Sequence, residues 1–188
     1  MGNGRVLLGD DREAAERAIV ANHYTHSIPS GKSHYIGFSD AVVVWSIPAN
    51  KNIAGFLCCS PGSVWELSRL WAPDGHEKNL LTMAISFAVR EIVRLERPEA
   101  LVSYADPNVG HKGGVYRAAS WHYNGTCEES RSYEPVAGGP MLSRRAFHSG
   151  KKSMTKEQIE ALGYTEVKLP GKERFVRPIS KSARRRFP

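Results

Sequence analysis

The segment between residues 80 and 95 constrains the fold of this chain more than any other. Apolar side chains recur there at intervals of three and four and would form one stripe along a helix: Leu80, Leu81, Ala84, Ile85, Ala88, Val89, Ile92 and Leu95. Strand-like stretches flank it at residues 64–71 and 100–105. A helix with one apolar face between two strands has to pack on a sheet, so the sequence predicts a protein with both helices and strands.

Further elements can be placed on either side of this segment. We expect a short strand at 6–8, a helix from Asp10 or Asp11, β-like stretches at 35–47 and 52–60, a short helix after 114, strands at 121–128 and 141–147, a helix at 155–163 and a strand at 173–179. This order predicts an α/β (α+β) fold with a mixed, mostly antiparallel central sheet flanked by helices. The expected division is a catalytic domain at 1–150, a basic helix-strand extension at 151–179 and a disordered basic tail at 180–188.

Length and charge narrow the class of protein. The chain has 188 residues and weighs 20.8 kDa, enough for one domain with a substantial core. Of its 26 Lys and Arg residues, 13 lie in residues 143–188, where four Glu oppose them. The first 142 residues carry a balance of −2 and the rest a balance of +9. This asymmetry predicts a polyanionic partner, and we favour nucleic acid over a merely solvated tail.

Composition excludes several other classes. No apolar run approaches the roughly 18 residues of a membrane span, and the first residues are too soon polar for a secretory signal, so we expect a cytoplasmic protein and no membrane partner. Three cysteines form neither a disulfide framework nor a Cys-x-x-Cys metal motif. Cys58 and Cys59 belong to a stretch that we interpret as a buried strand, where packing is favoured over nucleophilic catalysis.

The order of elements resembles the GNAT acyltransferase superfamily. In that superfamily the fourth strand and the N-terminus of the next helix hold the pyrophosphate of a CoA thioester, which suits helix N-termini as anion sites. The matching residues here are 67–79, and the resemblance implies cofactor contacts by Leu70, Trp71, Gly75 and Asn79. The stretch lacks the Gln/Arg-x-x-Gly-x-Gly/Ala loop of the superfamily and keeps only Gly75, so acetyl-CoA or another CoA thioester stays open as a cofactor.

A narrower resemblance runs from about residue 22 to residue 186. The matching stretches are 22–24 (Asn-His-Tyr), 66–71 (Glu-Leu-Ser-Arg-Leu-Trp), 103–106 (Ser-Tyr-Ala-Asp), 110–113 (Gly-His-Lys-Gly), then Tyr116, Trp121 and Gly125, and finally 172–176 (Lys-Glu-Arg-Phe-Val). In this order they resemble the Mom family of phage DNA-modification proteins. Each stretch is short, and it is their combination that is specific.

Members of the Mom family are GNAT-like proteins that convert adenine in phage DNA to N6-carbamoylmethyladenine and thereby protect it from host restriction nucleases. The resemblance therefore implies a transferase that modifies the N6 amine of adenine in double-stranded DNA, in the host cytoplasm if a phage encodes it. Carried over by position, the implied catalytic residues are His23, Tyr24, Arg69, Asp106 and Tyr116.

These residue types suit that chemistry. The adenine N6 amine is a poor nucleophile, so a base has to take its proton, and Asp106 at the end of a buried strand is our candidate, with an Asx turn as the alternative. Tyr116 would protonate the leaving group, unless it is a core aromatic. Arg69 follows apolar residues and needs an anionic partner, from the substrate or from within the protein. His23 and Tyr24 lie in a polar loop, where they can stack on a base or hydrogen-bond to it.

The sequence leaves the donor and any metal open. Acetyl transfer from CoA would join a carbonyl carbon to N6, whereas the carbamoylmethyl group is joined through its CH2 carbon. Either the donor is not acetyl-CoA, or a further step intervenes, for which metal assistance is one option. His23 and His26 have His-x-x-His spacing without a clear third ligand, which is weak support for a metal such as iron.

Duplex DNA is the expected partner. A base inside a duplex has to be flipped out or exposed by bending, and contacts to phosphates hold the DNA without reading its sequence. Homodimer formation is left open. The expected contacts to nucleic acid are His34, Tyr35, His111, Arg144, Arg145, Lys151, Lys152, Arg174, Arg177, Arg184, Arg185 and Arg186.

Two other functions stay open at this point. A GNAT-type N-acyltransferase acting on a protein or small-molecule amine would be stabilised by acetyl-CoA and would leave DNA unchanged. A non-catalytic phage DNA-binding protein on the same scaffold would bind DNA in a salt-dependent way, and replacing Asp106 or Tyr116 would not affect that binding.

Overall fold

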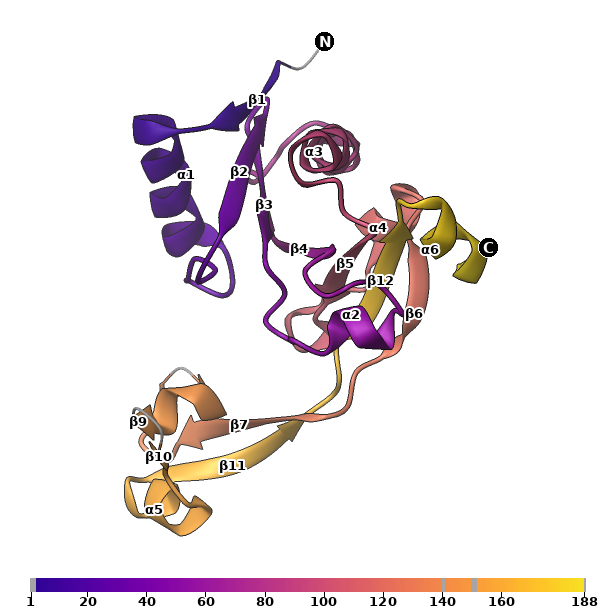
Figure 1. Cartoon of the computed structure of the whole chain (residues 1–188). Helices are drawn as coiled ribbons and strands as arrows, with labels where there is room; N and C mark the ends of the chain where they lie inside the picture. Colours follow the sequence, from indigo (N-terminus) through magenta and orange to yellow (C-terminus); the bar gives the residue numbers. More distant parts are fainter. Residues whose placement is uncertain (1–2, 140, 150–151, 188) are drawn as a thin grey trace.

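The computed structural model describes residues 3–139, 141–149 and 152–187. A seven-stranded sheet with the order β1–β2–β3–β4–β5–β12–β6 forms its centre (Figure 1). All neighbouring pairs are antiparallel except β4 and β5, which are parallel. The strands are β1 (Gly4–Leu7), β2 (Ser33–Phe38), β3 (Ala41–Ser46), β4 (Val64–Trp71), β5 (Ala100–Ala105), β6 (His122–Thr126) and β12 (Glu173–Pro178). The mixed, mostly antiparallel sheet expected from the sequence is confirmed.

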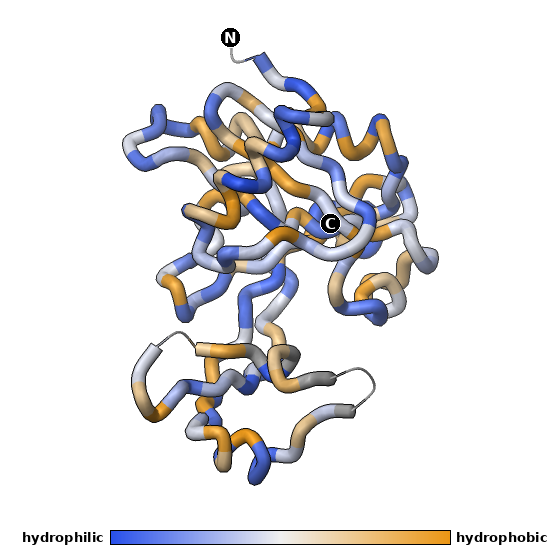
Figure 2. The backbone as a smooth tube through the Cα atoms, turned by 90° about the vertical axis from the view of Figure 1, so that its left-hand side faces the viewer, coloured by the Kyte–Doolittle hydropathy of each residue, from blue (hydrophilic) through white to orange (hydrophobic). Residues whose placement is uncertain are grey.

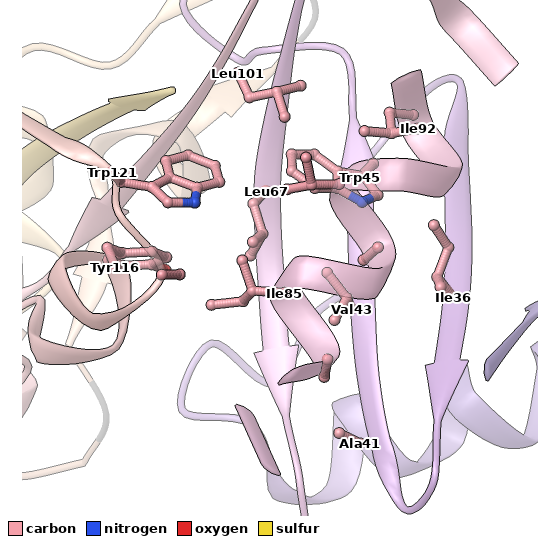
Figure 3. Close-up of a cluster of buried hydrophobic side chains, with 14 of the residues drawn as sticks. Ile36, Ala41, Val43, Trp45, Leu67, Ile85, Ile92, Leu101, Tyr116 and Trp121 are labelled. Carbon is pink, nitrogen blue, oxygen red and sulfur yellow. The ribbon is translucent and has the colours of Figure 1, made fainter. Parts of the chain in front are cut away.

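One face of this sheet is covered by helix α3 (Leu80–Glu96), which connects β4 to β5, and by the shorter α4 (Gly114–Ala118). The predicted stripe of α3 is buried from Leu80 to Ile92 except for Leu81, which is partly buried, and Leu95 at its end is exposed. Its side chains pack against apolar residues of β2 to β5 (Figure 3). Tyr116 of α4 and the following Trp121 complete this part of the core.

The opposite face is covered by α1 (Gly9–Asn22), α2 (Ile53–Phe56) and, near the C-terminus, α6 (Lys181–Arg186). Helix α1 follows Leu8 with no side-chain cap, so neither predicted Asp cap forms. The strand expected at 52–60 is wrong, because the apolar residues of this stretch have helical spacing and bury one side of α2, and Cys58 adopts a left-handed φ of 52° just after it. Cys58 is exposed and Cys59 is buried.

Two other predictions about local structure need correction. The stretch 35–47 holds two strands, because the chain turns at residues 39–40 between β2 and β3. Residues 181–186 form α6 instead of a disordered tail. The Ser180 hydroxyl accepts a hydrogen bond from the Ala183 backbone N–H at 3.1 Å, and Ala183 is fully buried. A cap and one buried Ala are weak signals inside a run of arginines.

A smaller unit projects from the central sheet on two chain segments (Figures 1 and 2). We call residues 130–169 the small lobe; Tyr133, Phe147 and Ile159 form its buried core. The helix expected at 155–163 is confirmed as α5, but 141–147 is a two-residue strand followed by a 3-10 turn, not one strand. The division of the chain at residues 150 and 179 stays a prediction. The lobe contains β7 (Ser130–Pro135), β8 (Leu142–Ser143), η2 (Arg144–Phe147), β9 (His148–Ser149), β10 (Lys152–Ser153), α5 (Lys156–Ala161) and β11 (Tyr164–Leu169).

Candidate active site

The parallel strands β4 and β5 separate partway along their length. Their paired positions run from Val64 and Ala100 to Leu67 and Ser103, yet β4 continues to Trp71 and β5 to Ala105. A cavity of about 320 Å³, which we call the central pocket, opens where the pairing stops. It is lined by Leu67, Ser68 and Leu70 of β4, Tyr104 and Ala105 of β5, Leu81 of α3, residues 110–116, and His23 and Tyr24 of the loop after α1.

Tyr116 is held in this pocket by Ser103. The Ser103 hydroxyl oxygen lies 2.8 Å from the Leu67 carbonyl oxygen and 2.8 Å from the Tyr116 hydroxyl oxygen. Burial raises the pKa of Tyr116 to about 12, despite the opposing effect of the bond to Ser103. The phenol therefore keeps its proton at neutral pH, and it is available to donate that proton. Tyr116 is at the same time a core aromatic, in ring contact with Trp121 and Phe175.

His23, Tyr24 and His111 form an aromatic group at the pocket. The ring centroids of His23 and Tyr24 are 4.5 Å apart, and Tyr24 meets His111 edge-to-face at 5.1 Å. Burial, followed by the charge of Arg69, lowers the pKa of His23 to about 4, so this imidazole is neutral at neutral pH. Its Nδ1 accepts a hydrogen bond from the Thr25 backbone N–H at 3.2 Å, which assigns the remaining proton to Nε2. His23 therefore offers a hydrogen-bond donor.

Asp106 directly follows Ala105 of the pocket lining, is not itself among the lining residues, and is held as a carboxylate. Lys172 Nζ lies 2.8 Å from its Oδ2, and Asn108 donates to Oδ1 from its backbone at 3.0 Å and from its side chain at 2.8 Å. Burial raises the pKa of Asp106, but the bonds from Lys172 and Asn108 lower it by more, so the pKa falls below its usual value. The bond from Asn108 is also the Asx turn that the sequence left as an alternative.

Arg69 fixes the loop that carries His23 and Tyr24. Its Nε donates to the Ser27 carbonyl oxygen at 2.8 Å, its Nη2 to the Ser27 hydroxyl oxygen at 3.2 Å, and its Nη1 to the Ser68 carbonyl oxygen at 2.7 Å. These neutral oxygens take up N–H donors of Arg69 that, from its position in the sequence, would be expected to bind an anion. In this structure Arg69 is a positioning residue.

The residues expected to hold a cofactor are not all at one place. Leu70 lines the central pocket. Trp71 packs on the other face of the sheet, against the cluster around α1. Gly75 and Asn79 have left-handed φ values of 76° and 69° in the connection from β4 to α3.

Most of the expected DNA contacts lie away from the pocket. Tyr35 is 1% exposed and packs beneath Arg12, so the structure makes it a core residue and not a contact surface. His34 is bonded to Glu96 at 2.6 Å. Arg144 is bonded within the small lobe, to the Tyr133 hydroxyl oxygen at 2.7 Å. Three further arginines are hydrogen-bonded within the protein: Arg174 to Asn124, Arg177 to Ala119 and Arg186 to Cys58. His111 lines the pocket, and Arg184 and Arg185 are exposed. Lys151 and the side chains of Arg145 and Lys152 lie outside the described residues.

Sequence reasoning missed three residues of the site: Ser103, Tyr104 and Lys172. All three belong to stretches that carried the family resemblance, but residue type alone gave no reason to select them. Lys172 reaches Asp106 only because residues 170–172 return past the end of β5, where the Pro170 carbonyl oxygen also accepts a hydrogen bond from Asn108 at 3.3 Å. Within the described part of the chain, no three His, Cys, Asp or Glu side chains are grouped to hold a metal ion. Among those same residues, no helix is long and apolar enough to span a membrane.

Solved structures define the class of this fold. It is similar to NAA60 of Arabidopsis thaliana, solved in complex with acetyl-CoA, with a TM-score of 0.57 and 9% identity over 95% of this chain and 99% of that one. It is also similar to a GNAT superfamily phosphinothricin acetyltransferase from Sinorhizobium meliloti, with a TM-score of 0.52 and 13% identity over 96% and 89% of the two chains. The protein therefore has a GNAT-like fold.

The sequence places it more narrowly. The model of the Mom protein family matches residues 9–188, so this chain belongs to the Mom protein family. It is 32% identical over 123 residues to the methylcarbamoylase mom of Escherichia phage Mu, which is 63% of this chain and 48% of the relative. The chain thus matches about half the length of that relative.

Proposed function

We propose that this protein transfers a carbamoylmethyl group to the N6 amine of adenine in double-stranded DNA. The observation that carries the proposal is membership of the Mom protein family, with a phage Mu methylcarbamoylase among its relatives. The volume of the central pocket, about 320 Å³, is at the lower end of the range of roughly 300–1,000 Å³ for small-molecule sites. That size suits one flipped base with a small group on it.

We assign the recognition of the flipped base to the aromatic group. Tyr24 and His111 offer ring surfaces for stacking, and neutral His23 offers its Nε2–H to a ring nitrogen of adenine, which is an acceptor. Arg69 contributes by holding the loop after α1 in place. This arrangement needs no charged group on the base, which agrees with adenine being neutral.

The proposed reaction replaces one N6–H bond by an N6–CH2 bond. The released proton has to be accepted, and we assign this role to the Asp106 carboxylate, which Lys172 keeps ionised. The bond from the methylene carbon to its leaving group breaks with the electron pair on the leaving group, and the protonated Tyr116 hydroxyl is the donor we assign to it. The chemical class of the leaving group stays open.

Acetyl-CoA fits this chain poorly. The connection from β4 to α3, where GNAT proteins hold the pyrophosphate of CoA, contains Asp74 and Glu77 and a single glycine, Gly75. With Lys78 the connection still carries a net negative charge, which is unfavourable near a pyrophosphate, and only one glycine is present to let the backbone approach it. Attack on the acetyl carbonyl would also give an N-acetyl product. We therefore derive no step through CoA, and rank N-acyl transfer to another amine second, on the fold alone.

Mass spectrometry of DNA tests the proposal. The chain is expressed in a bacterium, plasmid DNA is digested to nucleosides, and a deoxyadenosine heavier by C2H3NO is expected. Asp106→Asn and Tyr116→Phe should each lower its yield by about 100-fold or more, the usual loss for a proton-transfer group. Tyr123→Phe is the control matched to Tyr116→Phe, because it makes the same change at an exposed tyrosine that does not line the pocket. Unmodified deoxyadenosine from cells that contain folded protein would overturn the proposal, and stabilisation of the protein by acetyl-CoA would then favour the second function.

A further inference from the structure

A second hollow, away from the central pocket, is lined by basic side chains from four elements. They are Arg90 of α3, His122 of β6, Arg177 of β12 and Arg184 of α6. We call it the basic hollow; its volume is about 550 Å³, and its other lining residues are Val89, Val93, Ser120, Pro178, Ile179 and Phe187. None of these described lining residues carries a carboxylate.

The charges in the basic hollow have neutral partners or none among the described residues. Arg177 is half-buried and donates to the Ala119 carbonyl oxygen at 2.9 Å. Burial lowers the pKa of Arg177, and the positive charge of Arg184, which lines the same hollow, lowers it further. The guanidinium carbon of Arg90 lies 5.6 Å from the centre of the Phe87 ring. Glu91, the acidic neighbour of Arg90 in the chain, is paired with Arg94 at 2.7 Å.

Like charges brought together without a counter-ion are destabilising. The three arginines, Arg90, Arg177 and Arg184, belong to three different elements, so their convergence is a product of the fold. An anion bound between them would remove the repulsion. Guanidinium groups bind phosphate oxygens with paired hydrogen bonds, and phosphate is the anion that a protein acting on DNA meets most.

The basic hollow is separate from the central pocket but near it. Along β12, Arg177 is four residues from Glu173, which pairs with Ala105 at the pocket end of β5; that is about 13 Å along a strand. Along α3, Arg90 is nine residues beyond Leu81, again about 13 Å.

We propose that the basic hollow is a phosphate-binding site. The phosphate would come from the backbone of DNA beside the modified base, or from a phosphorylated small-molecule donor. The choice of these two sources rests on the proposed function, whereas the proposal that the hollow binds phosphate does not. Arg90 and Arg184, exposed and without carboxylate partners among the described residues, would supply most of the binding.

Two double variants test the site by an equal change of charge. Arg90→Gln with Arg184→Gln removes two charges from α3 and α6 within the hollow. The control is Arg97→Gln with Arg185→Gln, which removes two exposed charges just after α3 and in α6 that do not line it. Binding of a fluorescent DNA duplex is measured by anisotropy at several salt concentrations. We expect the first pair to weaken binding about tenfold at low salt and to reduce the slope of log K against log salt by about 2, and the control to change both less.

Pyrophosphate is the second probe and distinguishes the source of the phosphate. If pyrophosphate raises the melting temperature of the wild type and of the control but not of the first pair, while DNA binding is equal in all three, the site serves a phosphorylated small molecule. Equal behaviour of both pairs with both probes would overturn the proposal. The double variant Arg90→Lys with Arg184→Lys keeps both charges and should keep most of the binding. If a double variant does not fold, the single variants Arg184→Gln and Arg185→Gln provide the same comparison. All of these are binding measurements, so unmodified plasmid DNA would overturn the proposed function and leave this result standing.

Discussion

The Asp106 side chain stays charged because of the residues that bond to it. Its carboxylate is nearly buried, which would favour the neutral acid, yet Lys172 at 2.8 Å and two bonds from Asn108 favour the charged form. Lys172 reaches it from the segment that links the small lobe to β12. The charge on the proposed base therefore depends on how this link lies against the end of β5.

Replacing Lys172 by Met should lower the free energy of unfolding by about 1 kcal/mol at neutral pH, a modest value because the pair is partly exposed. The folded-state pKa of Asp106 is depressed, so its stabilisation is present above the unfolded-state pKa and is lost as the pH falls through the folded-state pKa. The difference in the free energy of unfolding between wild type and variant should therefore disappear as the pH falls through that acid range. Urea unfolding at several pH values measures it, with Lys168→Met, on the exposed side of β11, as the control. A difference that persists unchanged into acid would contradict the assignment.

Among the helices and strands, the sequence predicts best those in which an apolar pattern continues over many residues. The apolar stripe of α3 spans several turns, and β5 and β12 are strongly apolar or alternating, so each was placed within a residue or two. The short helices α2 and α6 were missed because a handful of residues cannot establish a period; tertiary contacts of Ile53 and Ala183 decide them. The assignment of the site residues stays a prediction; Lys172 is absent from it because its contact with Asp106 depends on a long return of the chain.

The start of α4 gives a prediction at this scale. Gly113 precedes the helix with a left-handed φ of 64°, and a Cβ there would overlap the ring of Phe175. Gly113→Ala should therefore destabilise the protein by roughly 2–4 kcal/mol, combining backbone strain and overpacking. Its neighbour Gly114 has open space and no positive φ, so Gly114→Ala should be neutral or stabilising. Urea unfolding of both variants measures the difference, and equal effects of the two would contradict this account of the turn.

At the scale of the whole molecule, the chain forms two bodies with separate cores. The central sheet has its clusters on both faces, and the small lobe has its own around Tyr133, Phe147 and Ile159. The lobe is joined through the segments before β7 and after β11 (Figure 1). Contacts at the link include the Cys127 backbone N–H, which donates to the Lys172 carbonyl oxygen at 2.8 Å, the Asn108 side-chain amide, which donates to the Pro170 carbonyl oxygen at 3.3 Å, and the pair of Lys172 with Asp106. Because the described buried residues of the lobe form a cluster of their own, each body should unfold on its own.

Ile159→Ala tests this independence, because the chain has four Trp, at positions 45, 65, 71 and 121, and all of them lie in the larger body. Ile159 is fully buried in the lobe, and its truncation should destabilise the lobe by about 2–5 kcal/mol. Amide hydrogen exchange in β7 and β11 should then quicken by the corresponding factor, while the urea midpoint of Trp fluorescence stays where it is in the wild type. Ile85→Ala, in the core beneath α3, should instead shift the Trp midpoint. A Trp midpoint that falls equally in both variants would mean that the two cores unfold as one unit, and that the link at Lys172 transmits the stability of the lobe to the active site.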